Sequence, residues 1–199
     1  VYKMKEEQYL LVVNASNIEK DFLWMQENNK FSAELRNESD GYSLLAVQGP
    51  NSKSVLEKIT DTSLDLDYYH FAKGKVAGKD MLISRTGYTG ELGFELYFKG
   101  NEIEAEEVWN EIFKAGEEFN IQPVGLGARD TLRLEMGYCL YGNDIDQTTN
   151  PLEAGLGWIT KLKKDTDFIG KDALQKIKAG GLKRKLTALT TDEKAKGFQ

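Results

Sequence analysis

The fold is decided by the stretch Phe94-Glu95-Leu96-Tyr97-Phe98. Side chains of a β-strand alternate between two faces, so the two phenylalanines and Leu96 share one face while Glu95 and the tyrosine share the other. The apolar face predicts a strand that packs on the core of the protein. A second strand is expected at residues 81–85, on the other side of the polar loop Thr86-Gly87-Tyr88-Thr89-Gly90-Glu91.

Glu95 lies in mid-strand among aromatic residues, and two interpretations of it are open. In the first, the strand is at the edge of its sheet and the carboxylate is in solvent, where most glutamates are found. In the second, the carboxylate is buried, and burial of a charge is costly unless hydrogen-bond donors meet it. A ligand with two neighbouring donors, such as a guanidine-like aminopyrimidinone edge, would supply them as two parallel hydrogen bonds.

The rest of the chain shows strand-like segments separated by single helix-like ones, with hairpin-like pairs in place of regular βαβ crossovers. This pattern predicts an α+β protein built on antiparallel sheets with helices packed on one face. We expect helices over residues 17–28, 51–59, 102–119, 126–136 and 171–178. We expect further strands over residues 1–4, 9–13, 31–36, 42–48, 156–160 and from 182 toward 189, and a β region that begins at 68–71.

Composition and charge exclude several classes of protein. The 199 residues include 26 basic and 32 acidic side chains, and the net charge of −6 argues against broad contact with a nucleic acid. The longest apolar runs, such as residues 9–13, are far shorter than the roughly 20 residues that a membrane helix needs, so we expect no membrane span. The single cysteine, Cys139, cannot form an internal disulfide, which favours the cytoplasm as the location.

Arg129 is expected near the start of a helix, one turn before Arg133. A cation at that end of a helix gains nothing from the helix dipole, so something else must hold it there. An ion pair with Asp130, Glu135 or a residue elsewhere in the domain is one explanation. A role in a binding site is the other.

Two aromatic residues are candidate walls of a ligand pocket. Tyr88 lies in the glycine-flanked turn 87–90, which can bring backbone amides or the ring close to a flat ligand. The turn lacks the lysine of a phosphate loop and does not match a dinucleotide fingerprint. Trp158 follows Gly155-Leu156-Gly157, whose glycines leave its ring faces open for stacking, although a core position is the default for such a residue.

We expect no metal site. Tyr141-Gly142-Asn143-Asp144-Ile145-Asp146 has the composition of the start of a calcium loop, but the later glycine and glutamate of that loop are missing. His70, the only histidine, lies among aromatic residues and is expected to be packed rather than catalytic. Cys139 has apolar neighbours, which favours an inert thiol over a nucleophile.

Two strings carry a resemblance to a known family: RTGYTGELGFE at residues 85–95 and GLGARDTLRLE at residues 125–135. They resemble the aminomethyltransferase of glycine cleavage, its T-protein. The Gly-Tyr-Thr-Gly-Glu turn alone is shared with folate-binding demethylases and sarcosine-type oxidases. The match runs in order over nearly the whole chain, through supporting strings at residues 11–17, 48–50, 137–146, 155–158 and 168–171.

The resemblance implies a folate-binding, T-protein-like fold and a reaction that uses tetrahydrofolate. An aminomethyl group on the lipoyl arm of a carrier protein, the implied partner, is given to tetrahydrofolate, which yields methylenetetrahydrofolate and ammonia. In the family, a glutamate at the position of Glu95 grips the pterin edge and an arginine at the position of Arg129 lines the same pocket. The resemblance makes Tyr88 and Trp158 candidate pocket walls, and Asn14 a candidate residue near the carbon-transfer point.

The resemblance also bears on domains, catalysis and location. Residues 1–181 are expected to form the folate-binding central region, as one body or two intertwined α+β subdomains, and residues 182–199 the start of a truncated C-terminal β domain. The family's catalytic aspartate belongs to a segment just before the strand that starts at Val1, so this polypeptide alone is expected to turn over poorly or not at all. The implied location is the bacterial cytoplasm, or the mitochondrial matrix in a eukaryote.

Two alternatives stay open from the sequence. The first is a related folate enzyme with another donor, such as a dimethylglycine or sulfonium demethylase, which would not accept a lipoylated carrier as substrate. The second is a non-catalytic folate-binding module. Modules of that kind carry a Lys-Gly-Cys-Tyr-x-Gly-Gln type string, which residues 137–143 lack.

Overall fold

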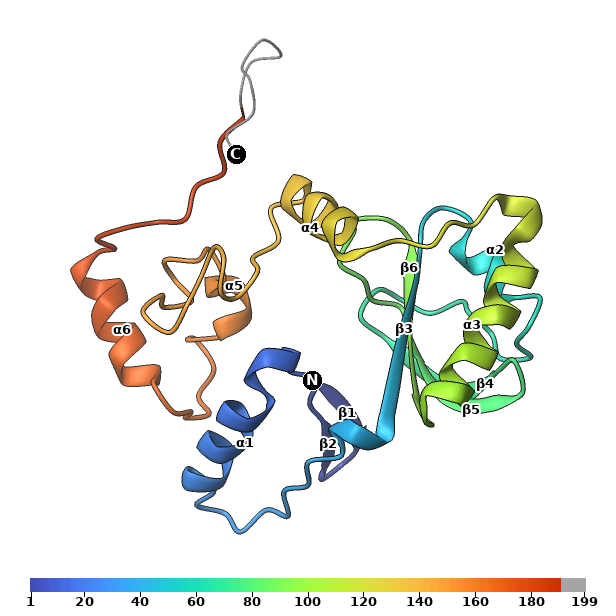
Figure 1. Cartoon of the computed structure of the whole chain (residues 1–199). Helices are drawn as coiled ribbons and strands as arrows, with labels where there is room; N and C mark the ends of the chain where they lie inside the picture. Colours follow the sequence, from blue (N-terminus) through green and yellow to red (C-terminus); the bar gives the residue numbers. More distant parts are fainter. Residues whose placement is uncertain (191–199) are drawn as a thin grey trace. The chain divides into compact units, whose positions relative to one another are not determined.

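A computed structural model of the chain describes residues 1–190 (Figure 1). The chain divides into two compact units, Val1–Leu132 and Arg133–Gln199. All the strands of the described part belong to the first unit. The structure confirms the predicted α+β class with antiparallel sheets, and residues 1–132 build those sheets.

The central element of the first unit is a four-stranded antiparallel sheet with the strand order β3-β6-β5-β4. β6 contains residues 94–98, and it pairs with β3 on one side and with β5 on the other. Because β6 is an interior strand, the interpretation that places Glu95 on a sheet edge is wrong. The strands are β3 (Tyr42–Gln48), β4 (Phe71–Val76), β5 (Lys79–Ser84) and β6 (Gly93–Lys99).

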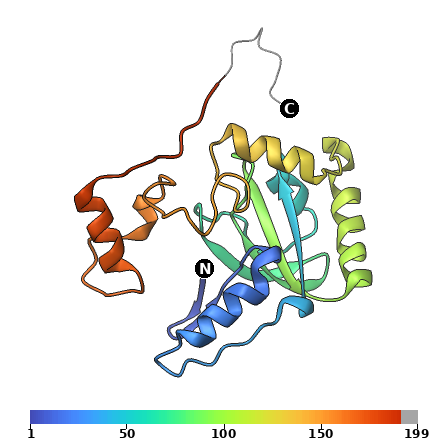
Figure 2. The same ribbon diagram turned by 60° about the vertical axis from the view of Figure 1, so that its left-hand side comes forward.

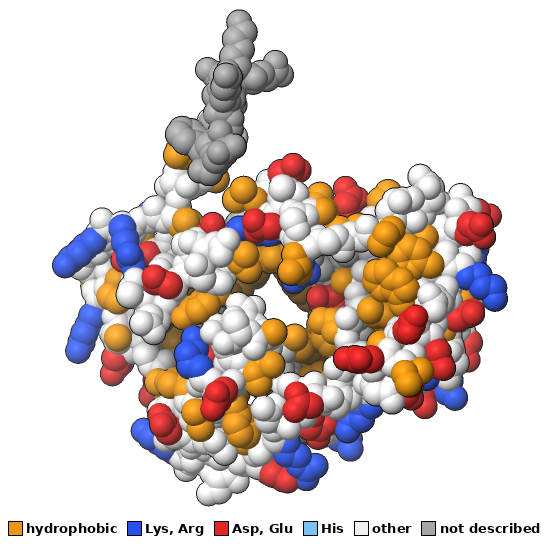
Figure 3. Space-filling view, in the orientation of Figure 1, with side chains coloured by type: hydrophobic (Ala, Val, Ile, Leu, Met, Phe, Trp, Pro, Cys, Tyr) orange, Lys and Arg blue, Asp and Glu red, His pale blue; other side chains and the backbone are white. Residues whose placement is uncertain are grey.

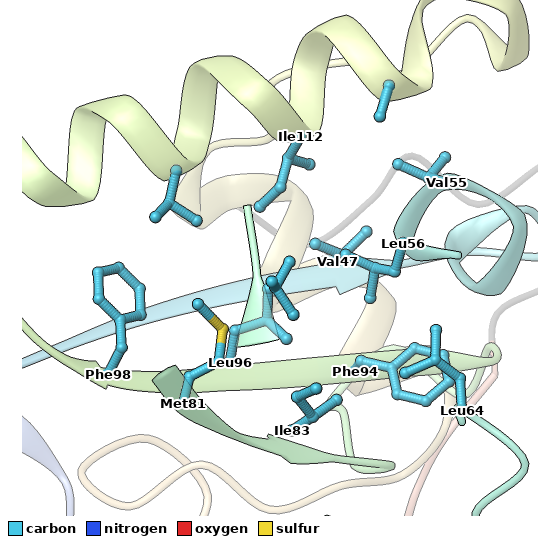
Figure 4. Close-up of a cluster of buried hydrophobic side chains, with 13 residues drawn as sticks. Val47, Val55, Leu56, Leu64, Met81, Ile83, Phe94, Leu96, Phe98 and Ile112 are labelled. Atoms are coloured by element: carbon cyan, nitrogen blue, oxygen red, sulfur yellow. The ribbon is translucent and has the colours of Figure 1, made fainter. Parts of the chain in front are cut away.

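One face of this sheet carries the hydrophobic core (Figure 4). The two phenylalanines and the leucine of β6 are fully buried, as their alternation predicts. α2 (Ser52–Leu56) and α3 (Glu102–Gly116) cover that face and contribute Val55, Leu56, Val108 and Ile112 to the core (Figure 2). α3 starts with a capping box, in which the side chains of Asn101 and Glu104 each accept a hydrogen bond from the other's backbone amide.

The other face of the sheet receives a hairpin made of β1 (Tyr2–Lys5) and β2 (Gln8–Leu10). The ring of Tyr2 meets the ring of Tyr97 edge-on, with 5.6 Å between centroids, and also meets the ring of Phe71 at 5.3 Å. Tyr97 shares its face of β6 with Glu95. The hairpin therefore brings Tyr2 to the side of the sheet that carries Glu95.

The remaining α-helices of the described residues are short, and most occur where the sequence predicts them. They are α1 (Ile18–Glu27), α4 (Leu126–Glu135), α5 (Gly157–Thr160) and α6 (Lys171–Gly180). α5 replaces the strand expected over residues 156–160. The hydroxyl of Thr160 and the amide of Ile159 both donate to the Leu156 carbonyl, and such a short apolar run fits a helical turn as well as a strand.

Two other predicted strands are wrong. Residues 31–36 form no ladder, and the Asn29 side chain instead bonds both backbone groups of Ala33, at 2.7 and 3.0 Å, which closes a local loop. Residues 182–190 form no strand either. The rest of the segment expected to start a C-terminal domain, residues 191–199, lies outside the described residues.

The second unit buries few side chains. Between residues 133 and 190, the buried residues are Arg133 and Ala154, at 3% and 8% exposure. Trp158 and Ile169 are both more than half exposed. On the face that Figure 3 presents, hydrophobic side chains accordingly reach the surface next to charged ones. No helix within residues 1–190 combines the length and the apolar character that a membrane crossing demands.

Leu96→Ala is expected to lower the free energy of unfolding by about 2–5 kcal/mol, because it opens a cavity in the middle of the core. Leu44→Ala is the matched control, since the side chain of Leu44 on β3 is 46% exposed, and it is expected to cost less than about 1 kcal/mol. Urea denaturation measures both. Equal losses in the two variants would contradict the assignment of the core face.

Candidate functional site

Glu95 is partly buried, and its two carboxylate oxygens have different surroundings. Oε2 accepts a hydrogen bond from the hydroxyl of Tyr97 at 3.2 Å and another from the hydroxyl of Thr86. No hydrogen bond from residues 1–190 reaches Oε1. Two hydroxyl donors therefore hold the carboxylate in place, while one oxygen is open to the donor of a ligand.

The hydroxyl groups around Glu95 form a closed ring of contacts. Tyr2 Oη lies 3.3 Å from Tyr97 Oη and 3.1 Å from Ser84 Oγ, and Ser84 Oγ lies 3.0 Å from Thr86 Oγ1. Together with the two contacts to Glu95, the ring has five contacts, but the four hydroxyl groups supply only four hydrogens. An ionised carboxylate only accepts, so the hydrogens of Thr86 and Tyr97 point to Oε2, and those of Tyr2 and Ser84 serve two of the three contacts between hydroxyls. Glu95 therefore keeps both of its donors, whichever contact between hydroxyls has no hydrogen.

Tyr97 is the donor whose protonation is most firmly set. Burial raises the pKa of its phenol far above the usual range, and the hydrogen bond with Tyr2 and the negative charge of Glu95 act in the same direction. The phenol is consequently neutral throughout the physiological range and can act as a hydrogen-bond donor to Glu95.

Tyr88, in the loop between β5 and β6 that also carries Thr86, makes a cation–π contact with Arg129. The Cζ atom of Arg129, in the first turn of α4, lies 4.8 Å from the centroid of the Tyr88 ring. No ion pair joins Arg129 to a carboxylate within residues 1–190, so neither Asp130 nor Glu135 holds this arginine in the structure. A cation over an exposed aromatic ring gains about 0.5–1 kcal/mol, and the N–H groups of the guanidinium stay open to an acceptor.

Of the five candidate residues, the loop between β5 and β6 therefore contains one, Tyr88, and contacts two others, Glu95 and Arg129. Thr86 bonds Glu95, and Tyr88, two residues later, lies against Arg129. A carboxylate oxygen and a guanidinium that bond no side chain of residues 1–190, together with an aromatic ring, are groups that can bind a flat, polar heterocycle.

The other two candidates are placed as follows. Asn14 is exposed in the first unit, where its carbonyl accepts from the amide of Asn17 at 2.9 Å and its side chain makes no hydrogen bond to residues 1–190. Trp158 belongs to the second unit. Its ring is 63% exposed and lines a cavity of about 310 Å³ together with Leu152, Gly155, Gly157, Lys178 and Leu182.

Arg133, which shares a helix face with Arg129, has a structural role. The residue is 3% exposed, and its guanidinium forms an ion pair with Asp144 and donates to the Tyr138 carbonyl at 3.1 Å. Asp144 also accepts from the amide of Leu140 at 2.9 Å. One carboxylate of the segment that has the composition of a calcium loop, Asp144, therefore pairs with a buried arginine. Among the described residues, no group of three or more His, Cys, Asp and Glu side chains is arranged to hold a metal ion.

Sequence reasoning missed the hydroxyl donors around Glu95. Alternation along β6 places Tyr97 on the same face as Glu95, and this signal was sufficient to find it. Thr86 reaches the carboxylate from a loop, while Tyr2 and Ser84 reach the hydroxyls of Tyr97 and Thr86 from other strands, and no local pattern indicates these contacts.

Comparison with known proteins defines the class. Residues 1–164 match the family model described as the GCVT N-terminal domain, and the chain belongs to this family. The fold agrees with a solved member. The structure of the glycine cleavage system aminomethyltransferase T from Bartonella henselae superposes with a TM-score of 0.71 at 32% identity, covering 84% of this chain and 45% of that one.

Similar curated proteins carry the name aminomethyltransferase. The protein from Halothermothrix orenii is 58% identical over 187 residues, which are 94% of this chain and 52% of the relative. The protein from Chloroherpeton thalassium is 61% identical over 175 residues, which are 87% of this chain and 48% of the relative. The chain spans about half the length of the curated relatives it matches.

Tyr97→Phe is expected to make the free energy of unfolding fall less steeply as the pH rises above about 10. The unfolded phenol ionises near its ordinary pKa of 10.0, whereas the folded phenol stays neutral far above it, so rising pH favours the unfolded chain. Above about pH 10 the parent should lose up to about 1.4 kcal/mol of unfolding free energy per pH unit more than the variant. Urea denaturation across this range measures the difference, and parallel curves would contradict the burial of a neutral phenol.

Proposed function

We propose that this chain is the folate-binding part of an aminomethyltransferase of glycine cleavage. In the proposed reaction, a one-carbon unit passes from the aminomethyl-lipoyl arm of a carrier protein to tetrahydrofolate, and ammonia is released. The observation that carries the proposal is the carboxylate of Glu95, held on an interior strand with Oε1 open, in a chain that belongs to the GCVT N-terminal domain family.

Glu95 is proposed to bind the edge of the pterin ring. A carboxylate has about four acceptor positions, and the hydroxyls of Thr86 and Tyr97 take two of them on Oε2. The N–H groups of an aminopyrimidinone edge fit the positions on Oε1. A charge-assisted bond of this kind is stronger than a neutral one and orients the ring, because the donors lie in its plane.

Tyr88 and Arg129 are proposed to line the same pocket. The aromatic ring offers a flat surface, and the guanidinium over it offers N–H donors to the polar atoms of the folate. The chemical problem is an iminium-like carbon that must be met by the folate N5 while water is kept away. In this proposal the three residues bind and orient the acceptor.

Trp158 and Asn14 receive less defined roles. We propose Trp158 as a surface for stacking of a flat ligand, since its ring is exposed beside an apolar cavity of the second unit. Asn14 is proposed near the carbon-transfer point, and its side-chain amide has no hydrogen-bond partner among residues 1–190 that it would have to give up.

The names of the relatives favour the aminomethyltransferase over the two alternatives, a folate-dependent demethylase and a non-catalytic folate-binding module. The proposed partner is accordingly the lipoylated carrier protein. The proposed location is the bacterial cytoplasm, which agrees with a single cysteine and with relatives from bacteria.

Glu95→Gln is expected to weaken the binding of tetrahydrofolate by about 1.5–3 kcal/mol, roughly 10- to 150-fold, because an amide donor replaces an acceptor oxygen. Isothermal titration calorimetry measures the affinity. Glu91→Gln is the matched control, since Glu91 is an exposed residue of the adjacent loop, and its affinity should equal that of the parent. If the parent binds and Glu95→Gln binds equally well, Glu95 is not part of the site; if the parent does not bind, the proposed function is wrong for this chain.

A further inference from the structure

The side chain of Gln48, at the end of β3, makes three hydrogen bonds to the segment that carries the candidate site. Its Nε2 atom donates to the carbonyl of Thr86 at 3.2 Å and to the carbonyl of Phe94 at 3.3 Å. Its Oε1 atom accepts from the hydroxyl of Thr89 at 3.2 Å. One amide group therefore ties together the entry, the tip and the exit of the loop between β5 and β6.

Two glycines of this segment make room for Gln48. A Cβ atom at Gly87 would lie 1.9 Å from Gln48 Oε1, and one at Gly93 would lie 2.2 Å from it. Neither glycine has a positive φ, so no backbone conformation requires glycine there, and a side chain at either position would displace the Gln48 amide from its hydrogen bonds. The group that lies beside Gly87 in this structure is the side-chain amide of the protein's own Gln48.

The junction between β3 and α2 holds the same segment at further points. The amide of Gly49 donates to the Leu92 carbonyl at 2.8 Å, and the hydroxyl of Ser52, which is buried, donates to the same carbonyl at 3.1 Å. These bonds hold the exit of the loop, whereas Thr89 at its tip is bonded by Gln48. The amide of Gln48 additionally bonds the Thr86 carbonyl, next to the part of the loop that carries Tyr88.

We propose that Gln48 is a positioning residue of the site formed by Glu95, Tyr88 and Arg129. Gln48 fixes the loop so that the Thr86 hydroxyl meets Glu95 and the Tyr88 ring lies under Arg129 before any ligand arrives. Order that exists before binding does not have to be created by the ligand, so the affinity is higher. The identity of the ligand, a reduced folate, rests on the proposed function, whereas the fixing of the loop does not.

Hydrogen exchange tests the fixing of the loop without a ligand. Gln48→Met keeps the length of the side chain and removes its amide. Peptides that span residues 85–95 are expected to exchange about tenfold faster in this variant, with the rest of the chain unchanged, because the local opening free energy falls. Gln26→Met on the exposed face of α1 is the control and should leave these peptides unchanged. Unchanged exchange in Gln48→Met overturns the proposal.

A double-mutant cycle tests the packing of Gln48 against Gly87 with other variants, which matters if Gln48→Met folds poorly. Gly87→Ala is expected to lower the midpoint of thermal unfolding strongly in the parent, where the new methyl group meets the glutamine amide, and only slightly in a Gln48→Ala background. Gly41→Ala is the control, because no atom lies within 4 Å of a Cβ at that position. If the shifts of Gly87→Ala and Gln48→Ala simply add, Gln48 does not occupy the space beside Gly87 and the proposal is overturned.

Titration with tetrahydrofolate tests whether the fixed position of the loop raises the affinity for the ligand. If the parent binds, Gln48→Met should weaken the affinity at least about tenfold, since misplaced contacts lose binding energy. Equal affinity of the parent and Gln48→Met overturns the positioning role. If the parent does not bind, the folate assignment fails by itself, and hydrogen exchange with the double-mutant cycle still decides whether Gln48 fixes the loop.

Discussion

The rest of the site depends on one constraint: a carboxylate on the interior strand of a sheet needs hydrogen-bond donors. Glu95 meets it through the hydroxyls of Thr86 and Tyr97, which both bond Oε2. Removing a carboxylate from water without hydrogen-bond donors costs on the order of several kcal/mol when it is fully buried, and less in this partly buried position. The loop between β5 and β6 and the hairpin that carries Tyr2 are consequently held close to β6, and the donors leave Oε1 as the acceptor that a ligand can use.

One face of β6 stabilises the fold, and the other carries the candidate binding group. Phe94, Leu96 and Phe98 lie in the core beneath α2 and α3, where close packing keeps the strand rigid. Glu95 and Tyr97 project to the other side. A rigid strand with its side chains locked by neighbours is the kind of support on which a binding group keeps a constant position. The second unit, between residues 133 and 190, has a much smaller core, and its buried Arg133 is satisfied by Asp144 and by the carbonyl of Tyr138.

Local patterns in the sequence predict the core face of β6, the helices α3 and α6, and the place of Glu95 opposite the core. They do not decide whether β6 is an edge or an interior strand, because the pairing with β3 joins residues about fifty positions apart. For the same reason they miss Gln48, whose three bonds all reach residues at least 38 positions away. Residues 156–160 show the limit for short apolar runs, which suit a strand and a helical turn equally.

Glu95 is proposed to hold the edge of a reduced pterin beside Tyr88. Nuclear magnetic resonance of the chain with tetrahydrofolate labelled with ¹⁵N in its pterin ring tests this claim most directly. We expect a pterin N–H signal that is shifted downfield, exchanges slowly with water, and shows a nuclear Overhauser effect to the ring protons of Tyr88. A pterin whose N–H groups exchange as they do in free solution, with no effect to Tyr88, would contradict it.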